Sequence, residues 1–137
     1  MKRIGILTSG GDCGGLNAAV RSIFYRAKEK YNLDVYGILE GTVGLMERPP
    51  RYIKLDYGTF SGNLIRQGGT FLGTTNKGNP FKYPMPDGTF KDRTTEIVGG
   101  YHELGLDGLI VIGGDGSMKI IKEIADKGNL NIVAIPK

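Results

Sequence analysis

The sequence predicts a three-layer α/β domain built on a mostly parallel sheet. An apolar run at residues 3–8 leads into a pattern of helical periodicity over 16–31, and a second apolar run follows at 33–39. The same order returns near the end of the chain, where runs at 107–112 and 131–135 enclose another helical pattern. Strands that alternate with helices in this way pair in parallel, and right-handed crossovers place the helices against the sheet.

Each predicted helix shows one apolar face. Between residues 16 and 31 the apolar positions repeat at helical spacing, with the basic side chains mostly outside that face. Asn32 follows, as expected where a helix ends. Residues 94–104 show a second such pattern, and the segment after Ser117 a third. Helices packed on such a sheet give the Rossmann-like arrangement that we expect. The predicted apolar face of the first helix consists of Leu16, Val20, Ile23, Phe24, Ala27 and Tyr31.

The middle of the chain lacks this regularity. Residues 48–88 contain five of the six prolines and many glycines. We expect loops there, with a short strand at 52–55 and a short helix at 61–66. A long irregular stretch in a small domain usually belongs to a binding site or contacts a part of the protein outside the stretch.

Composition narrows the class of protein. The 137 residues suffice for one compact domain, and the net charge is +4 with a pI of about 9.2. Lys and Arg are scattered and form no basic stripe, so we expect no nucleic-acid partner, whereas an anionic phosphate ligand suits this charge. The single cysteine, Cys13, excludes an intrachain disulfide. With no signal peptide and no run of ~18 apolar residues, we expect a cytoplasmic protein without a membrane partner.

Glycine marks the candidate site. The chain has 23 glycines, and several gather where apolar runs end. Two of these clusters, residues 10–15 and 113–117, leave a predicted strand and enter a predicted helix. At that edge of a parallel sheet the first N–H groups of a helix and its dipole favour phosphates, and glycine lets the backbone approach the phosphate oxygens.

Neither cluster matches a known phosphate-loop motif. There is no G-x-x-x-x-G-K-[ST], and residues 10–15 do not give G-x-G-x-x-G. A tight strand-to-helix turn would explain either cluster alone. The second cluster adds Asp115, whose carboxylate would repel a phosphate unless a cation such as Mg²⁺ lay between them. A helix-capping role for Asp115 remains open beside this one.

Four segments, taken in order, resemble the phosphofructokinase family. The resemblance covers the whole chain, and the four segments together are far more specific than any one of them. They are IGILTSGGD with LNAA (4–12 and 16–19), GGTFLG (68–73), GLIVIGGDGS (108–117) and the closing IPK (135–137).

The resemblance implies an activity and a set of site residues. Members of the family transfer a phosphoryl group from ATP or pyrophosphate to C1 of fructose 6-phosphate, giving fructose 1,6-bisphosphate in glycolysis. By resemblance, Asp115 serves Mg²⁺, and a solvated loop position remains an alternative for Lys77. The residues implied to contact the phosphoryl donor are Gly11, Asn76, Lys77, Gly114, Asp115, Gly116 and Ser117.

Two positions bear on the identity of the donor. Members that use ATP resemble this chain in having Gly at position 116, where pyrophosphate users tend to have Asp. Lys137 points the other way, because pyrophosphate users have Lys after the Pro. We expect ATP, since an Asp at position 116 would add charge and bulk to the nucleotide's phosphate site, and pyrophosphate remains the alternative.

The resemblance also implies where this chain stands in a longer enzyme. In the family a Thr-Ile-Asp-x-Asp segment follows the position of Lys137, and its first Asp is the base that acts on the sugar hydroxyl. We therefore expect residues 1–137 to be the N-terminal donor-binding part of a phosphofructokinase domain, with no catalytic residue of its own and no kinase activity alone. The fructose 6-phosphate site would lie mostly beyond it, and the parent enzyme would be a homotetramer or homodimer. A free-standing nucleotide-binding module, or a structural domain that keeps only the turns, would be the alternatives.

Overall fold

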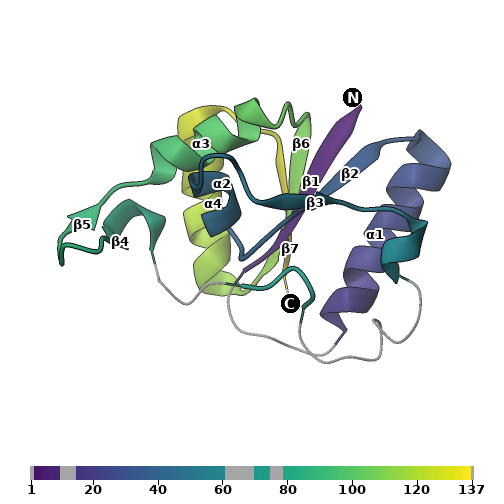
Figure 1. Ribbon diagram of the computed structural model, residues 1–137, viewed down its shortest axis with the longest axis horizontal. Coiled ribbons are helices and arrows are strands. Elements are labelled where there is room, and N and C mark those ends of the chain that lie inside the picture. Colours follow the sequence, from purple (N-terminus) through teal and green to yellow (C-terminus); the bar gives the residue numbers. More distant parts are fainter. Residues whose placement is uncertain (1, 10–14, 61–69, 75–78, 137) are drawn as a thin grey trace.

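The computed structural model describes residues 2–9, 15–60, 70–74 and 79–136, with only the backbone of Asp115. A five-stranded sheet carries helices on both faces, which confirms the predicted three-layer α/β architecture (Figure 1). Within the described ranges, no helix has the length and apolarity needed to cross a bilayer. In chain order the elements are β1 (Arg3–Thr8), α1 (Leu16–Tyr31), β2 (Asp34–Ile38), α2 (Val43–Met46), β3 (Tyr52–Lys54), η1 (Tyr57–Phe60), η3 (Pro80–Lys82), β4 (Tyr83–Pro84), β5 (Phe90–Lys91), α3 (Thr94–Glu103), β6 (Gly108–Gly113), α4 (Asp115–Gly128) and β7 (Ile132–Pro136).

The sheet is mostly parallel, as predicted. Its strand order is β3-β2-β1-β6-β7, and every pair is parallel except β2 with β3. The short strand expected at 52–55 is this antiparallel edge strand. The helix expected at 61–66 lies outside the described residues.

Two apolar cores lie on the two faces of the sheet. Because successive side chains of a strand point to opposite faces, Ile6 and Leu7 are both fully buried yet belong to different cores. The core around Ile6 contains the inward face of α1, and the core around Leu7 contains residues of α2, α3 and α4. Figure 1 shows this division, with α1 on one side of the strands and the other helices on the opposite side.

The predicted face of α1 is only partly correct. Leu16, Val20, Phe24 and Ala27 are buried, whereas Tyr31 is 58% exposed and Ile23 is half-buried. Ile23 and Tyr31 border a largely apolar cavity beside β6 and β7, and Ile23 also packs against the edge of the core around Ile6. The helix ends as predicted, since Asn32 has a left-handed conformation with a φ of 52°.

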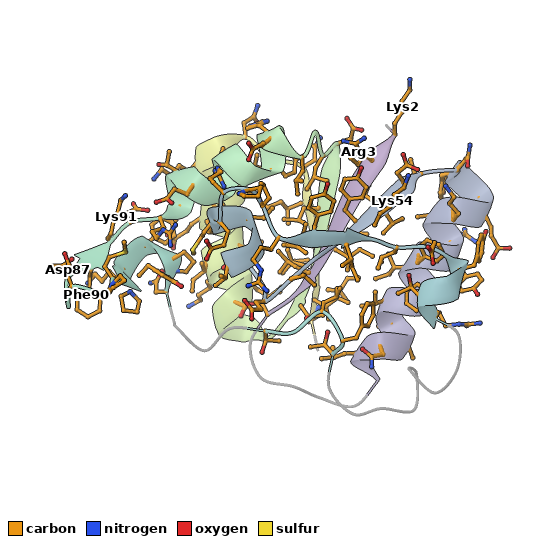
Figure 2. The ribbon with its side chains drawn as sticks, in the orientation of Figure 1. Lys2, Arg3, Lys54, Asp87, Phe90 and Lys91 are labelled. Atoms are coloured by element: carbon orange, nitrogen blue, oxygen red, sulfur yellow. The ribbon has the colours of Figure 1, made fainter. Side chains whose placement is uncertain are left out.

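Part of the predicted loop region forms a projecting arm. The short strands β4 and β5 pair antiparallel and reach away from the body of the domain, as Figure 1 shows. At the tip Phe90 is 71% exposed, and Figure 2 shows it together with Asp87 and Lys91. The turn is closed by a hydrogen bond from Met85 N to Thr89 O at 2.8 Å. The expectation of loops was wrong here because two-residue strands leave no periodic pattern in a sequence.

Helices α2 and α3 touch almost backbone to backbone. A Cβ added at Gly100 in α3 would collide with the Leu45 carbonyl in α2. The guanidinium of Arg48 joins the same two helices, donating to Leu45 O and to Glu96 O at 2.8 Å each. Glycine at position 100 is therefore a packing requirement of this interface.

Asp107 ties the start of β6 to the start of β1, and this contact should depend on pH. Its Oδ2 accepts the N–H groups of Lys2 and Arg3 at 2.9 and 3.0 Å, and these bonds hold the pKa of Asp107 below its usual value of 3.8. A carboxyl whose pKa is lower in the folded state stabilises the fold above its unfolded pKa, and that contribution is lost as the pH falls.

We therefore expect Asp107→Asn to flatten the loss of stability between about pH 5 and pH 3. Urea unfolding of the variant and the wild type at several pH values measures this loss. Asp126→Asn on α4 is the control for the same change in charge at another exposed carboxyl. Parallel acid profiles for Asp107→Asn and the wild type would contradict the expectation.

Candidate functional site

The two glycine clusters follow neighbouring strands. β1 and β6 pair in parallel with Thr8 opposite Ile112, so both chains leave the sheet side by side at its carboxyl edge. β2 and β6 flank β1 on its two sides, and α1 and α4 therefore leave this edge toward opposite faces. Such a reversal of strand order opens a crevice in which α/β proteins bind ligands.

The second cluster is tighter than the sequence suggested. Gly113 still belongs to β6, and α4 begins at Asp115 with Gly114 as its N-cap. The helix therefore begins earlier than the expected position after Ser117, and Gly114, not Asp115, occupies the N-cap position, because the strand runs almost directly into the helix. Among the described residues, a Cβ at Gly114 or Gly116 would meet no atom within 4 Å. The first N–H groups of α4 have no partner within their own helix, which is the general feature that lets a helix start bind an anion.

A serine pair joins the two clusters. Ser9 Oγ donates to Ser117 Oγ at 3.1 Å, and Ser9 N donates to Ile112 O at 2.9 Å. At Gly113 a Cβ would lie 3.2 Å from Ser9 O and 3.1 Å from Ser117 Cβ, so only glycine allows this approach without a shift. The start of the first cluster is therefore held against the first turn of α4.

A third segment, residues 70–74, meets the same edge. Thr8, at the end of β1, is fully buried, and its Oγ1 lies 3.0 Å from both Thr70 Oγ1 and Gly73 O. Asn17 in the first turn of α1 is also buried, and its Oδ1 accepts Phe71 N–H at 2.8 Å. The sequence analysis gave Thr8 and Asn17 no separate role. The available signal was a polar residue placed next to a glycine cluster within an otherwise apolar pattern.

The structure brings part of the predicted site together. Gly114, Gly116 and Ser117 lie at the start of α4, where the backbone of Asp115 forms the first helical residue. Gly11, Asn76 and Lys77 lie outside the described residues.

The donor set suits Mg²⁺ only as a shared site. Among the described side chains, no group of three His, Cys, Asp or Glu residues could hold a metal ion. Mg²⁺ needs only one or two protein carboxylates when phosphate oxygens and water supply the other ligands. Asp115, whose backbone forms the first residue of α4, would supply one such carboxylate.

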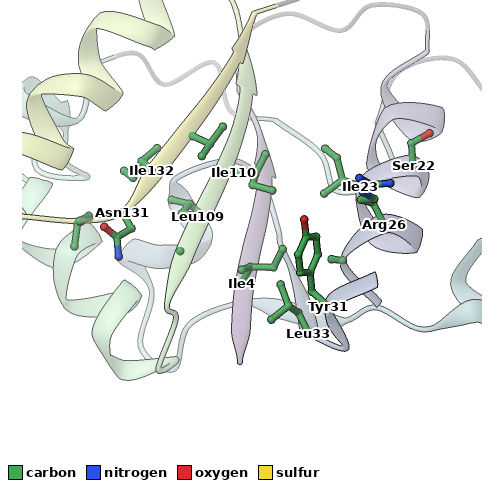
Figure 3. A pocket seen from close by; sticks show the side chains of 14 residues that line it. Ile4, Ser22, Ile23, Arg26, Tyr31, Leu33, Leu109, Ile110, Asn131 and Ile132 are labelled. Carbon is green, nitrogen blue, oxygen red and sulfur yellow. The ribbon is translucent and has the colours of Figure 1, made fainter. Parts of the chain in front are cut away.

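A cavity with a mainly apolar lining lies away from these residues. It measures about 830 Å³ and is bordered by α1 and by the amino-terminal halves of β1 and β6. Figure 3 shows its apolar lining, with Ile23 of α1 facing Ile110 and Ile132 of the sheet. Although Ser22, Arg26 and Asn131 also border it, the cavity lies away from the carboxyl edge of the sheet where α/β proteins bind phosphates, so the candidate site is that edge.

Fold and site together define a doubly wound α/β domain in which two glycine clusters of the sequence follow neighbouring strands at a switch in strand order. The family model described as Phosphofructokinase matches residues 3–137. The chain belongs to the phosphofructokinase family, as the sequence resemblance indicated.

Individual relatives agree with this membership. The chain is 58% identical over 137 residues to ATP-dependent 6-phosphofructokinase 1 of Synechocystis sp., covering all of this chain and 38% of that protein. It is 55% identical over 136 residues to ATP-dependent 6-phosphofructokinase 1 of Nostoc sp., covering 99% and 37%. The T-state phosphofructokinase of Pichia pastoris superposes with a TM-score of 0.75 at 29% identity, covering 98% of this chain and 15% of that one. The chain thus spans less than two fifths of the curated relatives named here.

Proposed function

We propose that this chain is the N-terminal, donor-binding part of a glycolytic kinase that transfers a phosphoryl group from ATP to C1 of fructose 6-phosphate. The main support is the Ser9–Ser117 hydrogen bond, which joins the residue that precedes the first glycine cluster to the first turn of α4 at one sheet edge. The two most similar relatives described above carry the name ATP-dependent 6-phosphofructokinase. The base that acts on the sugar hydroxyl, and most of the fructose 6-phosphate site, would lie beyond residue 137.

The start of α4 would bind the phosphates of the donor. The N–H groups of Gly116 and Ser117 belong to the first turn of a helix, where the macrodipole favours an anion. Gly11, Asn76 and Lys77 would add contacts from the other two segments, and the Lys77 ammonium would offset phosphate charge. These groups orient the donor, and positioning with charge neutralisation is most of what phosphoryl transfer requires of a protein.

Asp115 would hold the Mg²⁺ that such kinases use. When bound, Mg²⁺ neutralises charge on the phosphoryl donor. The position of Asp115 at the first residue of α4 places its backbone beside the same helix start that would receive the phosphates. We further propose that the protein is cytoplasmic and that the complete enzyme is a homotetramer or homodimer.

ATP is the proposed donor, and pyrophosphate is the second candidate. No atom of the described residues lies within 4 Å of a Cβ built at Gly116, which leaves room for a nucleotide's phosphates that an Asp side chain would occupy. Lys137 favours pyrophosphate, by resemblance to family members that use it. Activity of the complete polypeptide with fructose 6-phosphate and either donor distinguishes the two, and absence of turnover with ATP would contradict the proposal.

We expect Asp115→Ala to weaken Mg²⁺-dependent ATP binding to the complete polypeptide by about 100-fold, since a metal ion contributes several kcal/mol of charge stabilisation. Calorimetric titration of ATP with and without Mg²⁺ measures the effect. Asp126→Ala removes an exposed carboxyl near the other end of α4 and should leave binding unchanged. Equal Mg²⁺ dependence in both variants would contradict the metal role of Asp115.

A further inference from the structure

We propose that Thr8 and Asn17 are positioning residues of the phosphoryl-donor site, because they hold residues 70–73 against the end of β1 and the first turn of α1. This inference rests on the proposed function. Residues 70–73 are also tied to the end of β2, where Glu40 N donates to Leu72 O at 2.8 Å. Leu72 itself is buried in the core beneath α1.

The hydroxyl groups form a chain with one direction. Thr8 Oγ1 donates its only hydrogen to Gly73 O at 3.0 Å, so Thr70 must be the donor in the contact between the two hydroxyls. Thr70 Oγ1 in turn accepts Leu72 N–H at 3.2 Å. Each hydroxyl hydrogen therefore has one acceptor. Removal of the Thr8 hydroxyl would leave both Gly73 O and the Thr70 hydroxyl without this partner.

Asn17 adds a second fastening from another element. It is only 2% exposed and stands one residue after the start of α1, immediately beyond the first glycine cluster. Its bond to Phe71 N–H therefore links the start of α1 directly to residues 70–73. A buried amide costs free energy unless it is hydrogen-bonded, so an apolar residue would serve simple core packing better at this position.

The fastened residues lead directly into the proposed donor contacts. Thr8 precedes Gly11 by three residues, and Gly73 precedes Asn76 by three. Thr8 is also followed by Ser9, whose hydroxyl donates to Ser117 in the first turn of α4 at 3.1 Å, so the contacts of Thr8 with residues 70 and 73 set their position relative to the helix start that would receive the phosphates. Misplacement of a binding group by about 1 Å can cost a large part of its contribution to catalysis.

If the hydroxyl chain had a purely structural role, its removal would lower the Tm without changing the KM for ATP. Thr94 supplies the matched control for this case. Thr94 is also a fully buried threonine in a hydrogen-bond network, with Asp92 Oδ1 at 2.6 Å and Lys127 Nζ at 2.8 Å. Lys127 stands roughly 18 Å along α4 from its first residue. Thr94→Val thus removes a comparable hydroxyl far from the start of that helix.

The test measures steady-state kinetics and thermal stability of the complete polypeptide. We expect Thr8→Val to raise the KM for ATP about tenfold, with the KM for fructose 6-phosphate changed less than twofold. Thr8→Ser, which keeps the hydroxyl, should return the KM for ATP to within twofold of the wild type. Asn17→Ala should also raise it. Thr94→Val should lower the Tm without changing the KM for ATP.

Thr70→Val serves if Thr8→Val does not fold, because Thr70 is only half-buried and belongs to the same chain of hydroxyls. An unchanged KM for ATP in an active Thr8→Val or Thr70→Val enzyme would overturn the positioning role while leaving the proposed function intact. If the wild-type polypeptide phosphorylated fructose 6-phosphate with neither ATP nor pyrophosphate, the proposed function and this inference would both be refuted.

Discussion

Gly100→Ala should lower the free energy of unfolding by about 2 kcal/mol, even though alanine is the better helix former. The substitution gains about 1 kcal/mol of helix propensity in α3. Its methyl group would collide with the Leu45 carbonyl, a backbone atom that cannot rotate away. Relief of this collision would separate α2 from α3 and loosen the core that contains Leu45 and Ile97. Overpacking of this kind lowers the free energy of unfolding by about 1–3 kcal/mol. Urea unfolding measures the difference.

The neighbouring glycine provides the control. A Cβ at Gly99 would lie 2.8 Å from Arg48 Nη2, the far end of a flexible side chain. Gly99→Ala gains the same helix propensity and costs at most the bond from Arg48 to Glu96 O, so its stability should stay within about 1 kcal/mol of the wild type. If Gly100→Ala proved as stable as Gly99→Ala, the two helices would not pack as closely as described.

Gly116→Asp should separate stability from donor use. Since a side chain at position 116 meets open space, the variant should fold, and a carboxylate in the first turn of α4 should add about 0.3–1 kcal/mol of helix stability. The same carboxylate would compete with the donor's phosphates for the helix start and repel them. We expect kcat/KM for ATP to fall about 100-fold, equivalent to about 2.7 kcal/mol of transition-state stabilisation.

The comparison with Gly116→Ala separates charge from bulk. Alanine fills some of the space without adding charge, so it should reduce kcat/KM for ATP far less than aspartate does. Pyrophosphate lacks the bulk of a nucleotide, so Gly116→Asp should lower kcat/KM for pyrophosphate less than it lowers kcat/KM for ATP. A Gly116→Asp enzyme with unchanged kcat/KM for ATP would show that position 116 does not face the donor.

Most of the fold could be predicted because its signals are local. The runs at β1, β6 and β7 are short, apolar and bounded by glycine or asparagine, and α1 shows a clear helical period. The helix α2 was missed because four residues, Val43–Met46, span barely one turn and show no period. Tyr31 was assigned to the buried face because helical spacing shows toward which side a residue points but not how deeply it is buried. In the structure Tyr31 is exposed and borders the cavity.

The candidate site was predictable only where it follows the chain. Gly114 to Ser117 stand together in sequence at a strand-to-helix turn, so their role could be inferred from local pattern. The contacts that assemble the site join residues far apart in sequence. The residue numbers differ by 62 for Thr8 and Thr70 and by 108 for Ser9 and Ser117. Hydroxyl hydrogen bonds leave no periodic signature, and only the folded sheet reveals them.

The pairing of β1 with β6 also sets the earliest time during synthesis at which this edge of the sheet can form. Ile4 lies opposite Gly108, so the first strand made waits for more than a hundred residues before its second neighbour is available. At a synthesis rate of 5–20 residues per second, that wait lasts roughly 5 to 20 seconds. During this interval the nascent chain can pair β1 with β2 but has no second turn to place beside the first. Binding of the proposed donor across both glycine clusters would therefore stabilise the domain only after β6 has been added.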